Sequence, residues 1–280
     1  MSPVGTPTAT QPAVALRFRR DAASLTRDQL ALLRQAFDAL YGIKDDRGYL
    51  YFAGIHGLPL PISCGNAHGT PYFLPWHRAY LYFFERAMRD QVADAELAWW
   101  DWRTPATARG TIPRSYSAAR TGQTANPLYS GPVDPLALTQ GRRQGLDVAS
   151  STQRRPGAAG APRLPSVQEV EQVLRLSDFV DFSGQVEELH NRVHVWVGGH
   201  MGMIPFAAFD PIFWAHHTMI DRLWRLWQLR YPNATPPAAL LDQALPPFRM
   251  TVRQTLDVTA LGYDYAVASS SQLTIAPGGG

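Results

Sequence analysis

The sequence contains a single cysteine, Cys64, so no disulfide can form within the chain. It has no run of about eighteen apolar residues, the length that a membrane-spanning helix needs. Its first residues lack the basic and apolar segments of an ordinary signal peptide, which leaves the location open between the cytoplasm and export with a partner. These absences predict a soluble protein with no membrane partner.

Charged side chains are also scarce, at 18% of the chain, and the net charge is only +3. The positive residues are almost all arginines, and many lie within residues 103–163, which are rich in proline, alanine and glycine. A solvated loop explains this pattern better than a nucleic-acid surface does, so we expect no nucleic-acid partner.

The length of 280 residues and the apolar share of 45% are enough for a large core. We expect a single domain over residues 1–280, in which residues 1–13 are a loose N-terminal tail and 266–280 a C-terminal tail. Residues 104–165 are too long for an ordinary connection and predict a surface excursion. Histidines lie on both sides of this excursion, so a domain boundary there would divide them.

Helical patterns are frequent along the chain. Thr26 and Gln29 form a capping-box pattern ahead of apolar residues at helical spacing, and this helix is expected to close at Gly42. Residues 14–18 alternate between apolar and other residues, which predicts a short edge strand. Residues 49–75 contain many glycines and prolines, so we expect them to be irregular.

Three later segments also have helical patterns. Pro75 is well placed to start a helix whose apolar residues recur at spacings of three and four. Residues 179–197 carry another apolar face, and Asp210 and Pro211 have the N-cap and first-turn chemistry of a third helix. The fold class is therefore mainly α, with long irregular loops and minor short strands.

His190 and His194 lie four residues apart in a segment without proline or glycine until Gly198. On a helix both imidazoles would leave the same face, where one metal ion could bind them. The alternative is that they are two polar positions of an amphipathic helix. Other histidines change that balance: His56, His68 and His77 precede this pair and His217 follows it.

Two long stretches carry a family resemblance. Residues 68–85 (H-G-T-P-Y-F-L-P-W-H-R-A-Y-L-Y-F-F-E) and 210–221 (D-P-I-F-W-A-H-H-T-M-I-D) resemble the two copper-binding signatures of the tyrosinase and polyphenol oxidase family. The H-N-R-V-H of residues 190–194 fits the paired ligands of the second copper. Residues 261–265 resemble the tyrosine motif that closes the catalytic domain, so the resemblance covers roughly residues 30–265.

The resemblance implies a four-helix core around a dinuclear type 3 copper centre, in which two copper ions bind dioxygen between them. Six neutral nitrogen ligands without a carboxylate suit ions that cycle between Cu(I) and Cu(II). His216 is expected to pack beside the ligands. The implied ligands are His56, His68 and His77 for one ion, and His190, His194 and His217 for the other.

The resemblance also assigns residues to the reaction. A glutamate and an asparagine at the places of Glu187 and Asn191 hold a water that deprotonates incoming phenols, because a phenol has a pKa near 10 and must reach copper as phenolate. The alternative for Glu187 is an exposed helix acid. Val195 and Ile204 are expected at the substrate entrance, where Ile204 would narrow it and favour catechols.

Cys64 lies four residues before His68, whereas the fungal spacing for a cysteine–histidine thioether is two. Two alternatives apply to Cys64: it forms that crosslink, or it is a small buried thiol. Asp221, one turn after His217, could orient a histidine or pair with Arg78. An exposed helix acid is the alternative for Asp221.

The resemblance implies an oxidase that converts o-diphenols to o-quinones with reduction of O2 and hydroxylates monophenols more slowly. The alternatives are an o-aminophenol oxidase, an oxygen carrier of haemocyanin type and a structural zinc protein. Expected partners are small phenols and O2. We expect no shielding domain after Tyr265, which would argue against the carrier and suggest a separate copper-delivery protein.

Overall fold

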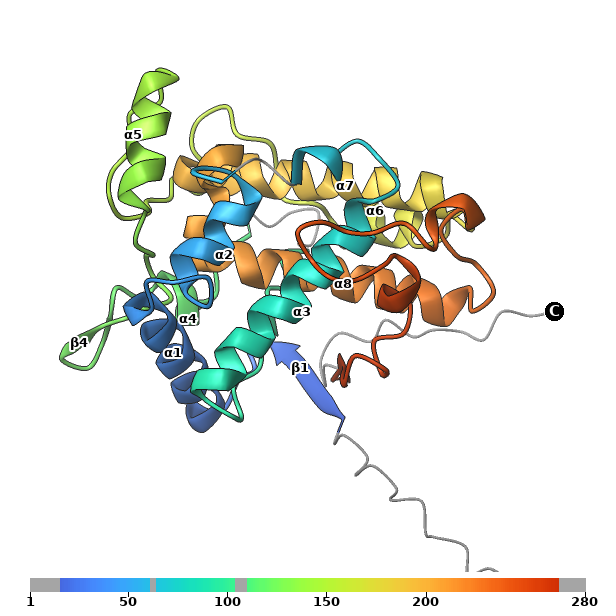
Figure 1. The fold of residues 1–280 in the computed structure, drawn as a ribbon, viewed down its shortest axis with the longest axis horizontal. Coiled ribbons are helices and arrows are strands. Elements are labelled where there is room, and N and C mark those ends of the chain that lie inside the picture. Colours follow the sequence, from blue (N-terminus) through green and yellow to red (C-terminus); the bar gives the residue numbers. More distant parts are fainter. Residues whose placement is uncertain (1–15, 61–63, 104–109, 267–280) are drawn as a thin grey trace, which may run out of the picture.

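A computed structural model gives the structure of residues 16–60, 64–103 and 110–266 (Figure 1). It is mainly helical, as predicted. The α-helices are α1 (Arg27–Gly42), α2 (Tyr49–His56), α3 (Phe73–Gln91), α4 (Arg114–Ser117), α5 (Pro135–Arg143), α6 (Val167–Val173), α7 (Phe179–Val197) and α8 (Pro211–Arg230). The strands are β1 (Arg17–Asp21), β2 (Ala98–Trp99), β3 (Arg120–Thr121), β4 (Thr124–Ala125) and β5 (Tyr263–Tyr265). The 3₁₀ helices are η1 (Cys64–Asn66), η2 (Gly199–Gly202), η3 (Ile204–Phe209), η4 (Ala238–Leu240) and η5 (Arg253–Thr255).

Helices α3, α7 and α8 pack against one another and form the centre of the molecule (Figure 1). Helix α8 begins as the sequence predicts, because the Asp210 side chain accepts a hydrogen bond from the backbone N–H of Ile212 and Pro211 occupies the first turn. Nearly every residue of α8 up to Trp224 is buried. This helix therefore runs through the core and can hold side chains away from water.

Helix α1 packs on α3 and is also predicted correctly. The Thr26 hydroxyl accepts from the backbone N–H of Gln29, and the Gln29 side chain accepts from that of Thr26. This reciprocal pair is the capping box expected from the sequence. The helix ends at Gly42, as expected.

The prediction of an irregular segment over residues 49–75 is wrong in two places. Tyr49–His56 forms α2, which places His56 at the end of a helix, and α3 begins at Phe73 instead of Pro75. Six of the eight residues of α2 are buried, so the segment lacks the polar face whose periodicity would reveal a helix. Tertiary burial thus stabilises a helix that local patterns hide.

Of the strand predicted at a sheet edge over residues 14–18, residues 14–15 lie outside the described part of the chain, residues 17–18 belong to a strand, and the edge setting is wrong. Strand β1 begins at Arg17 and lies in the middle of a three-stranded sheet, in the order β2-β1-β5. Both neighbours pair with it in parallel, Arg20 opposite Ala98 and Phe18 opposite Asp264. Parallel partners come from distant parts of the chain, so the local sequence cannot show that both edges are used.

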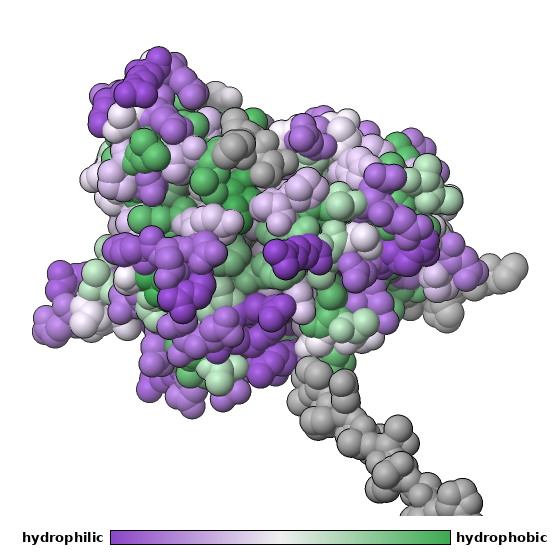
Figure 2. Space-filling model, in the orientation of Figure 1, coloured by the Kyte–Doolittle hydropathy of each residue, from purple (hydrophilic) through white to green (hydrophobic). Residues whose placement is uncertain are grey.

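The long excursion predicted over residues 104–165 is described from residue 110 onward. It contains α4, the β3–β4 hairpin and α5, which projects from the body (Figure 1). Figure 2 shows mainly hydrophilic side chains on the projecting end, whereas Tyr116 and Leu128 are buried against the core. The tail expected over residues 1–13 lies outside the described residues, as does 267–280. Within the described ranges, no helix is long and apolar enough to cross a membrane.

A buried ion-pair network links the sheet to the central helices. Arg19 donates to Glu85 at 2.9 Å and to Asp221 at 3.0 Å, and Arg78 also donates to Asp221. Burial alone would raise the pKa of Asp221, but the two arginines outweigh it and lower that pKa. The pairing of Asp221 with Arg78 is therefore confirmed, and the exposed-acid alternative for Asp221 is wrong.

Candidate metal centre

Seven of the eight histidines gather in two clusters. They come from α2, α3, α7, α8 and the turn after η1, so four buried helices and one loop position them. Within each cluster the candidate ligand atoms all lie within 4.8 Å of one another. The first cluster is His56, His68 and His77, and the second is His190, His194, His216 and His217.

In the first cluster, each histidine turns its Nδ1 atom toward an oxygen acceptor. These contacts are His56 to the Ile204 carbonyl (3.3 Å), His68 to the Glu187 carboxylate (2.8 Å) and His77 to the Phe73 carbonyl (2.8 Å). An acceptor at Nδ1 places the proton there and leaves the lone pair on Nε2. The three Nε2 atoms are buried and have no hydrogen-bond partner. They are thus oriented as metal ligands.

The second cluster repeats this arrangement at two of its four histidines. His190 Nδ1 lies 3.1 Å from Asn191 Oδ1, and His194 Nδ1 lies 2.7 Å from the Met201 carbonyl. The Nε2 atom of His217 is 3.3 Å from Nε2 of His190 and 3.4 Å from Nε2 of His194. Two of these three converging atoms carry lone pairs, because their Nδ1 protons are held by oxygens. A cation between these three Nε2 atoms would accept their lone pairs and remove the repulsion among them.

The two clusters face each other. The rings of His77 and His217 are stacked with centroids 4.5 Å apart and planes 19° apart. The rings of His68 and His190 have centroids 5.4 Å apart. Helices α3 and α8, and the His68 turn and α7, therefore bring the clusters together as one dinuclear metal site.

Burial favours the neutral form of six of these imidazoles. Desolvation is the largest cause that lowers the pKa of six of them, and neighbouring histidines add to it. For His194 the pKa falls to about 4. The histidines with a lowered pKa are His56, His77, His190, His194, His216 and His217. Neutral imidazole is the form that binds metals, so the environment favours metal over protons.

The donor set fits a pair of transition-metal ions. Each cluster offers at least three imidazole nitrogen atoms and no carboxylate, which suits copper, zinc or nickel and excludes calcium and magnesium. The unpartnered Nε2 atoms of the first cluster would be costly in a dry interior without an ion. This environment matches the copper pair that the sequence resemblance implies.

His216 is one of the candidate ligands of the second cluster, whereas the sequence predicts that it packs beside the ligands. Its ring stacks on His190 with centroids 5.1 Å apart, and both of its nitrogens are buried without a hydrogen-bond partner. The only sequence feature that indicates a place for His216 in the cluster is that it directly precedes His217. His200 lies in neither cluster: its Nδ1 accepts from the Gln153 backbone N–H and its Nε2 donates to the Ala149 carbonyl.

Glu187 is buried rather than an exposed helix acid. Its Oε1 atom accepts from His68 Nδ1 at 2.8 Å and from the Gly69 backbone N–H at 2.9 Å. The places of Glu187 and Asn191, three before and one after His190, predict that both side chains reach the face of the second ion. The structure instead places its carboxylate against a histidine of the first cluster, while Asn191 contacts His190 of the second. The two side chains thus contact different clusters.

Cys64 is fully buried, and its thiol donates to the His56 carbonyl at 2.6 Å. Burial raises the pKa of this thiol to about 12. The backbone N–H of His68 donates to the Cys64 carbonyl, so the turn between them holds the two backbones close together. The thioether and the free buried thiol both stay alternatives for Cys64.

The clusters meet the solvent at His68 and His194, which are only partly buried. Val195, next to His194, is 52% exposed, and Ile204, whose carbonyl contacts His56, is 58% exposed. Both residues expected at the entrance thus lie on the surface next to histidines.

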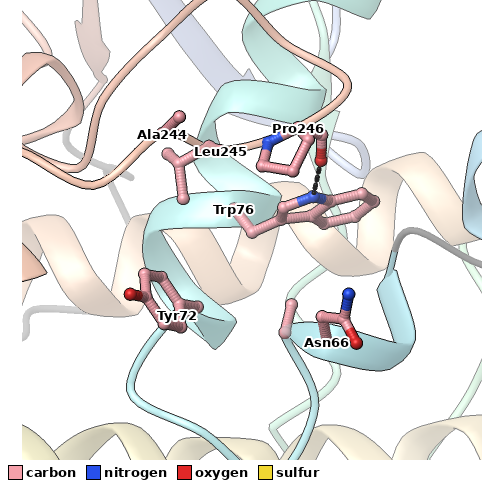
Figure 3. Close-up of a pocket in the computed structure, with 7 residues that line it drawn as sticks. Asn66, Tyr72, Trp76, Ala244, Leu245 and Pro246 are labelled. Atoms are coloured by element: carbon pink, nitrogen blue, oxygen red, sulfur yellow. Dashed lines mark hydrogen bonds between the residues drawn. The ribbon is translucent and has the colours of Figure 1, made fainter.

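A small pocket of about 110 Å³ lies between the start of α3 and the C-terminal loop (Figure 3). Trp76 forms one wall, and its indole N–H donates to the Pro246 carbonyl at 2.8 Å. Asn66 and Tyr72 also line the pocket. The hydrogen bond from Trp76 to Pro246 holds the loop of residues 244–246 against α3, the helix that carries His77.

Comparison with known proteins agrees with the site. Residues 46–230 match the common central domain of tyrosinase. Tyrosinases of Streptomyces antibioticus and Streptomyces glaucescens are 32% and 33% identical over 267 residues. These alignments cover 86% and 84% of this chain and 96% and 94% of the relatives. The chain therefore belongs to the tyrosinase family of type 3 copper proteins.

Haemocyanins are similar to this chain as well. A haemocyanin of Enteroctopus dofleini (units Ode to Odg) is 33% identical over 227 residues, covering 75% of this chain and 18% of its own. A functional unit of octopus haemocyanin superposes with a TM-score of 0.71 at 26% identity, over 89% of this chain and 68% of that one. A copper-bound active tyrosinase of Aspergillus oryzae gives 0.74 at 21% identity, over 92% and 93%, and shows the shared fold.

Proposed function

We propose that this protein is a copper-dependent oxidase that converts o-diphenols to o-quinones with reduction of O2, and hydroxylates monophenols more slowly. The observation that carries this proposal is the pair of facing histidine clusters. The match to nearly the whole length of two Streptomyces tyrosinases supports it. O-aminophenol oxidation by the same site is the alternative within this class.

One ion would be held by His56, His68 and His77, and the other by His190, His194 and His217. The choice of His217 over His216 rests on the short distances from its Nε2 to two other Nε2 atoms. When bound, copper supplies the two-electron redox chemistry that links diphenol oxidation to O2 reduction. Oxidation of two diphenols to quinones yields the four electrons and four protons that convert one O2 to two waters.

The protein's own part is to receive the phenol proton. We assign this to Glu187, acting through a water that Asn191 helps to hold. Two N–H donors, from His68 and Gly69, fix the carboxylate on the His68 side of the site. Its oxygens keep spare lone pairs, so it can still accept a proton from a phenol whose ordinary pKa is near 10.

Ile204 and Val195 would border the path of the substrate. Their exposed apolar side chains suit the ring of a small phenol. Ile204 narrows this entrance, so catechols are expected to be better substrates than monophenols. A separate copper-delivery protein remains part of the proposal.

The test is turnover by protein loaded with two copper ions, followed as quinone absorbance and O2 consumption. Catechol should be oxidised fastest, a monophenol more slowly, and an o-aminophenol in the same panel measures the alternative. Metal-free and zinc-loaded protein serve as controls and should be inactive. Copper-loaded protein that turns over none of these substrates would overturn the proposal.

An oxygen carrier is the second candidate, because the octopus haemocyanin matches at the same identity as the tyrosinases. A carrier should bind O2 reversibly and leave catechol unoxidised. The partly exposed His68 and His194 favour the oxidase, since a substrate ring needs access to the metal site.

A further inference from the structure

A second hollow, of about 540 Å³, lies on the excursion between α4 and the segments around residues 130 and 153. None of its lining residues belongs to the histidine clusters. Its volume is in the range of small-molecule sites, which is about 300–1,000 Å³. The residues that give it its chemistry are Ile112, Ser117, Tyr129, Ser151, Gln153 and Pro156.

The floor of the hollow is held by hydrogen bonds between two chain segments. The Thr152 backbone N–H donates to the Gly131 carbonyl at 2.9 Å, and the Gly131 N–H donates to the Thr152 hydroxyl at 2.9 Å. The Ser130 hydroxyl donates to the Thr152 carbonyl at 2.8 Å. These contacts join the two segments that line the hollow.

Several polar groups at the rim are still available. Ser117, Tyr129, Ser151 and Gln153 are exposed, and within the described part of the chain no hydrogen bond engages their side chains. The Tyr129 side chain is 45% exposed and presents an aromatic surface. The hollow therefore combines free hydroxyl and amide groups with an aromatic ring.

The one charged lining residue, Arg154, does not offer a free charge. Its Nε atom is 2.9 Å from both carboxylate oxygens of Asp210. Its Nη1 donates to the Tyr116 carbonyl at 2.6 Å and its Nη2 to the Leu128 carbonyl at 3.1 Å. An anionic ligand would find no unpaired cation here, so the site favours a neutral one.

We propose that this hollow binds a neutral saccharide of one or two rings. A sugar ring has an apolar C–H face and an edge of hydroxyls, and it needs both kinds of surface at once. Tyr129, Ile112 and Pro156 supply the apolar surface, while the side chains of Ser151 and Gln153 supply donors and acceptors. The proposal is independent of the oxidase activity.

The experiment uses the full chain and ligand-observed NMR with maltose and cellobiose at about 1–10 mM, where a weak site is detectable. Saturation should transfer from the protein to the sugar protons. Tyr129→Ala and Gln153→Ala should each weaken binding at least fivefold, whereas Tyr51→Ala, which removes an exposed tyrosine from α2, should leave it unchanged. Circular dichroism and the melting temperature show whether each variant is folded.

Absence of transfer to either disaccharide in the wild type would overturn the proposal. So would equal binding by the Tyr129→Ala and Gln153→Ala variants, because the sugar would then lie elsewhere. A preference for glucose 6-phosphate over glucose would contradict the neutral character of the hollow. If the copper-loaded wild-type protein binds the sugar but shows no oxidase activity, only the proposed function is overturned.

Discussion

The Glu187 carboxylate accepts a hydrogen bond from His68 Nδ1 at 2.8 Å, across 119 positions of the sequence. Helix α7 carries both Glu187 and two histidines of the second cluster, His190 and His194. A single helix thus orients ligands of both clusters. A change at Glu187 can act on proton transfer, on the orientation of His68, or on both.

Glu187→Gln separates these roles. The amide keeps one oxygen for His68 and Gly69 but removes the charge that accepts a phenol proton. We expect kcat/KM for a monophenol to fall about 100-fold and that for catechol about tenfold or less, in line with general-base effects. Copper content is measured alongside. Glu188→Gln, which alters the exposed neighbour, is the matched control and should leave both values unchanged.

An equal fall for both substrates at full copper loading would assign Glu187 to positioning His68 alone. No fall in either would remove it from the reaction. Loss of copper from the variant would show instead that the charge on Glu187 stabilises the first ion through His68.

The ligand assignment predicts the effect of His194→Ala. This change removes one of the three nitrogens that converge at the second ion. Copper should fall from two ions to about one per chain, and catechol turnover should fall by more than about 100-fold, since even indirect partners of a ligand cost 10–100-fold. His200→Gln is the control, because His200 is buried but lies in neither cluster. Normal activity of His194→Ala would contradict the assignment.

The sequence predicts the ligand-bearing part of the molecule well where local chemistry decides it. Asp210 and Pro211 start α8 as expected, and the four-residue spacing of His190 and His194 places both on α7. These predictions rest on helix caps and helical periodicity, which are local. They do not depend on the rest of the fold.

The groups that orient the histidines could not be predicted. His56, His77 and His194 direct Nδ1 to backbone carbonyls, and every residue has a carbonyl, so the sequence carries no mark of which one is used. The carbonyl partner of His56 belongs to Ile204, 148 positions away. Helix α2 was missed for a related reason, since burial on nearly all sides removes its periodicity.

Cys64 can be tested by mass. Its thiol donates to the His56 carbonyl, which favours a free buried thiol over a thioether to His68. The intact mass of copper-loaded, active protein should therefore equal the calculated value. Because burial raises the pKa of the thiol to about 12, alkylation should be slow in the folded protein and complete after unfolding. A mass lower by two hydrogen atoms, with a Cys64 that cannot be alkylated after unfolding, would establish the crosslink.

The buried histidines also predict how the stability of the metal-free protein depends on pH. An unfolded histidine has a pKa near 6.5, whereas burial lowers the pKa of six cluster histidines in the folded state, that of His194 to about 4. Below pH 6.5 the unfolded chain binds more protons than the folded one. The free energy of unfolding should therefore be greatest above pH 6.5 and fall as the pH decreases toward 4, by about 1.4 kcal/mol per pH unit for each proton taken up on unfolding.

Urea unfolding of metal-free protein between pH 8 and pH 4 measures this dependence. The variant His194→Ala should show a shallower slope, because it has one fewer depressed histidine. His200→Gln provides the comparison, since His200 lies outside the clusters. In copper-loaded protein the fall should begin at a lower pH, because the metal and the protons compete for the same Nε2 atoms. A stability that is flat across this range would show that folding leaves the pKa values of the cluster histidines unchanged, and would contradict the buried, neutral imidazoles on which the metal site depends.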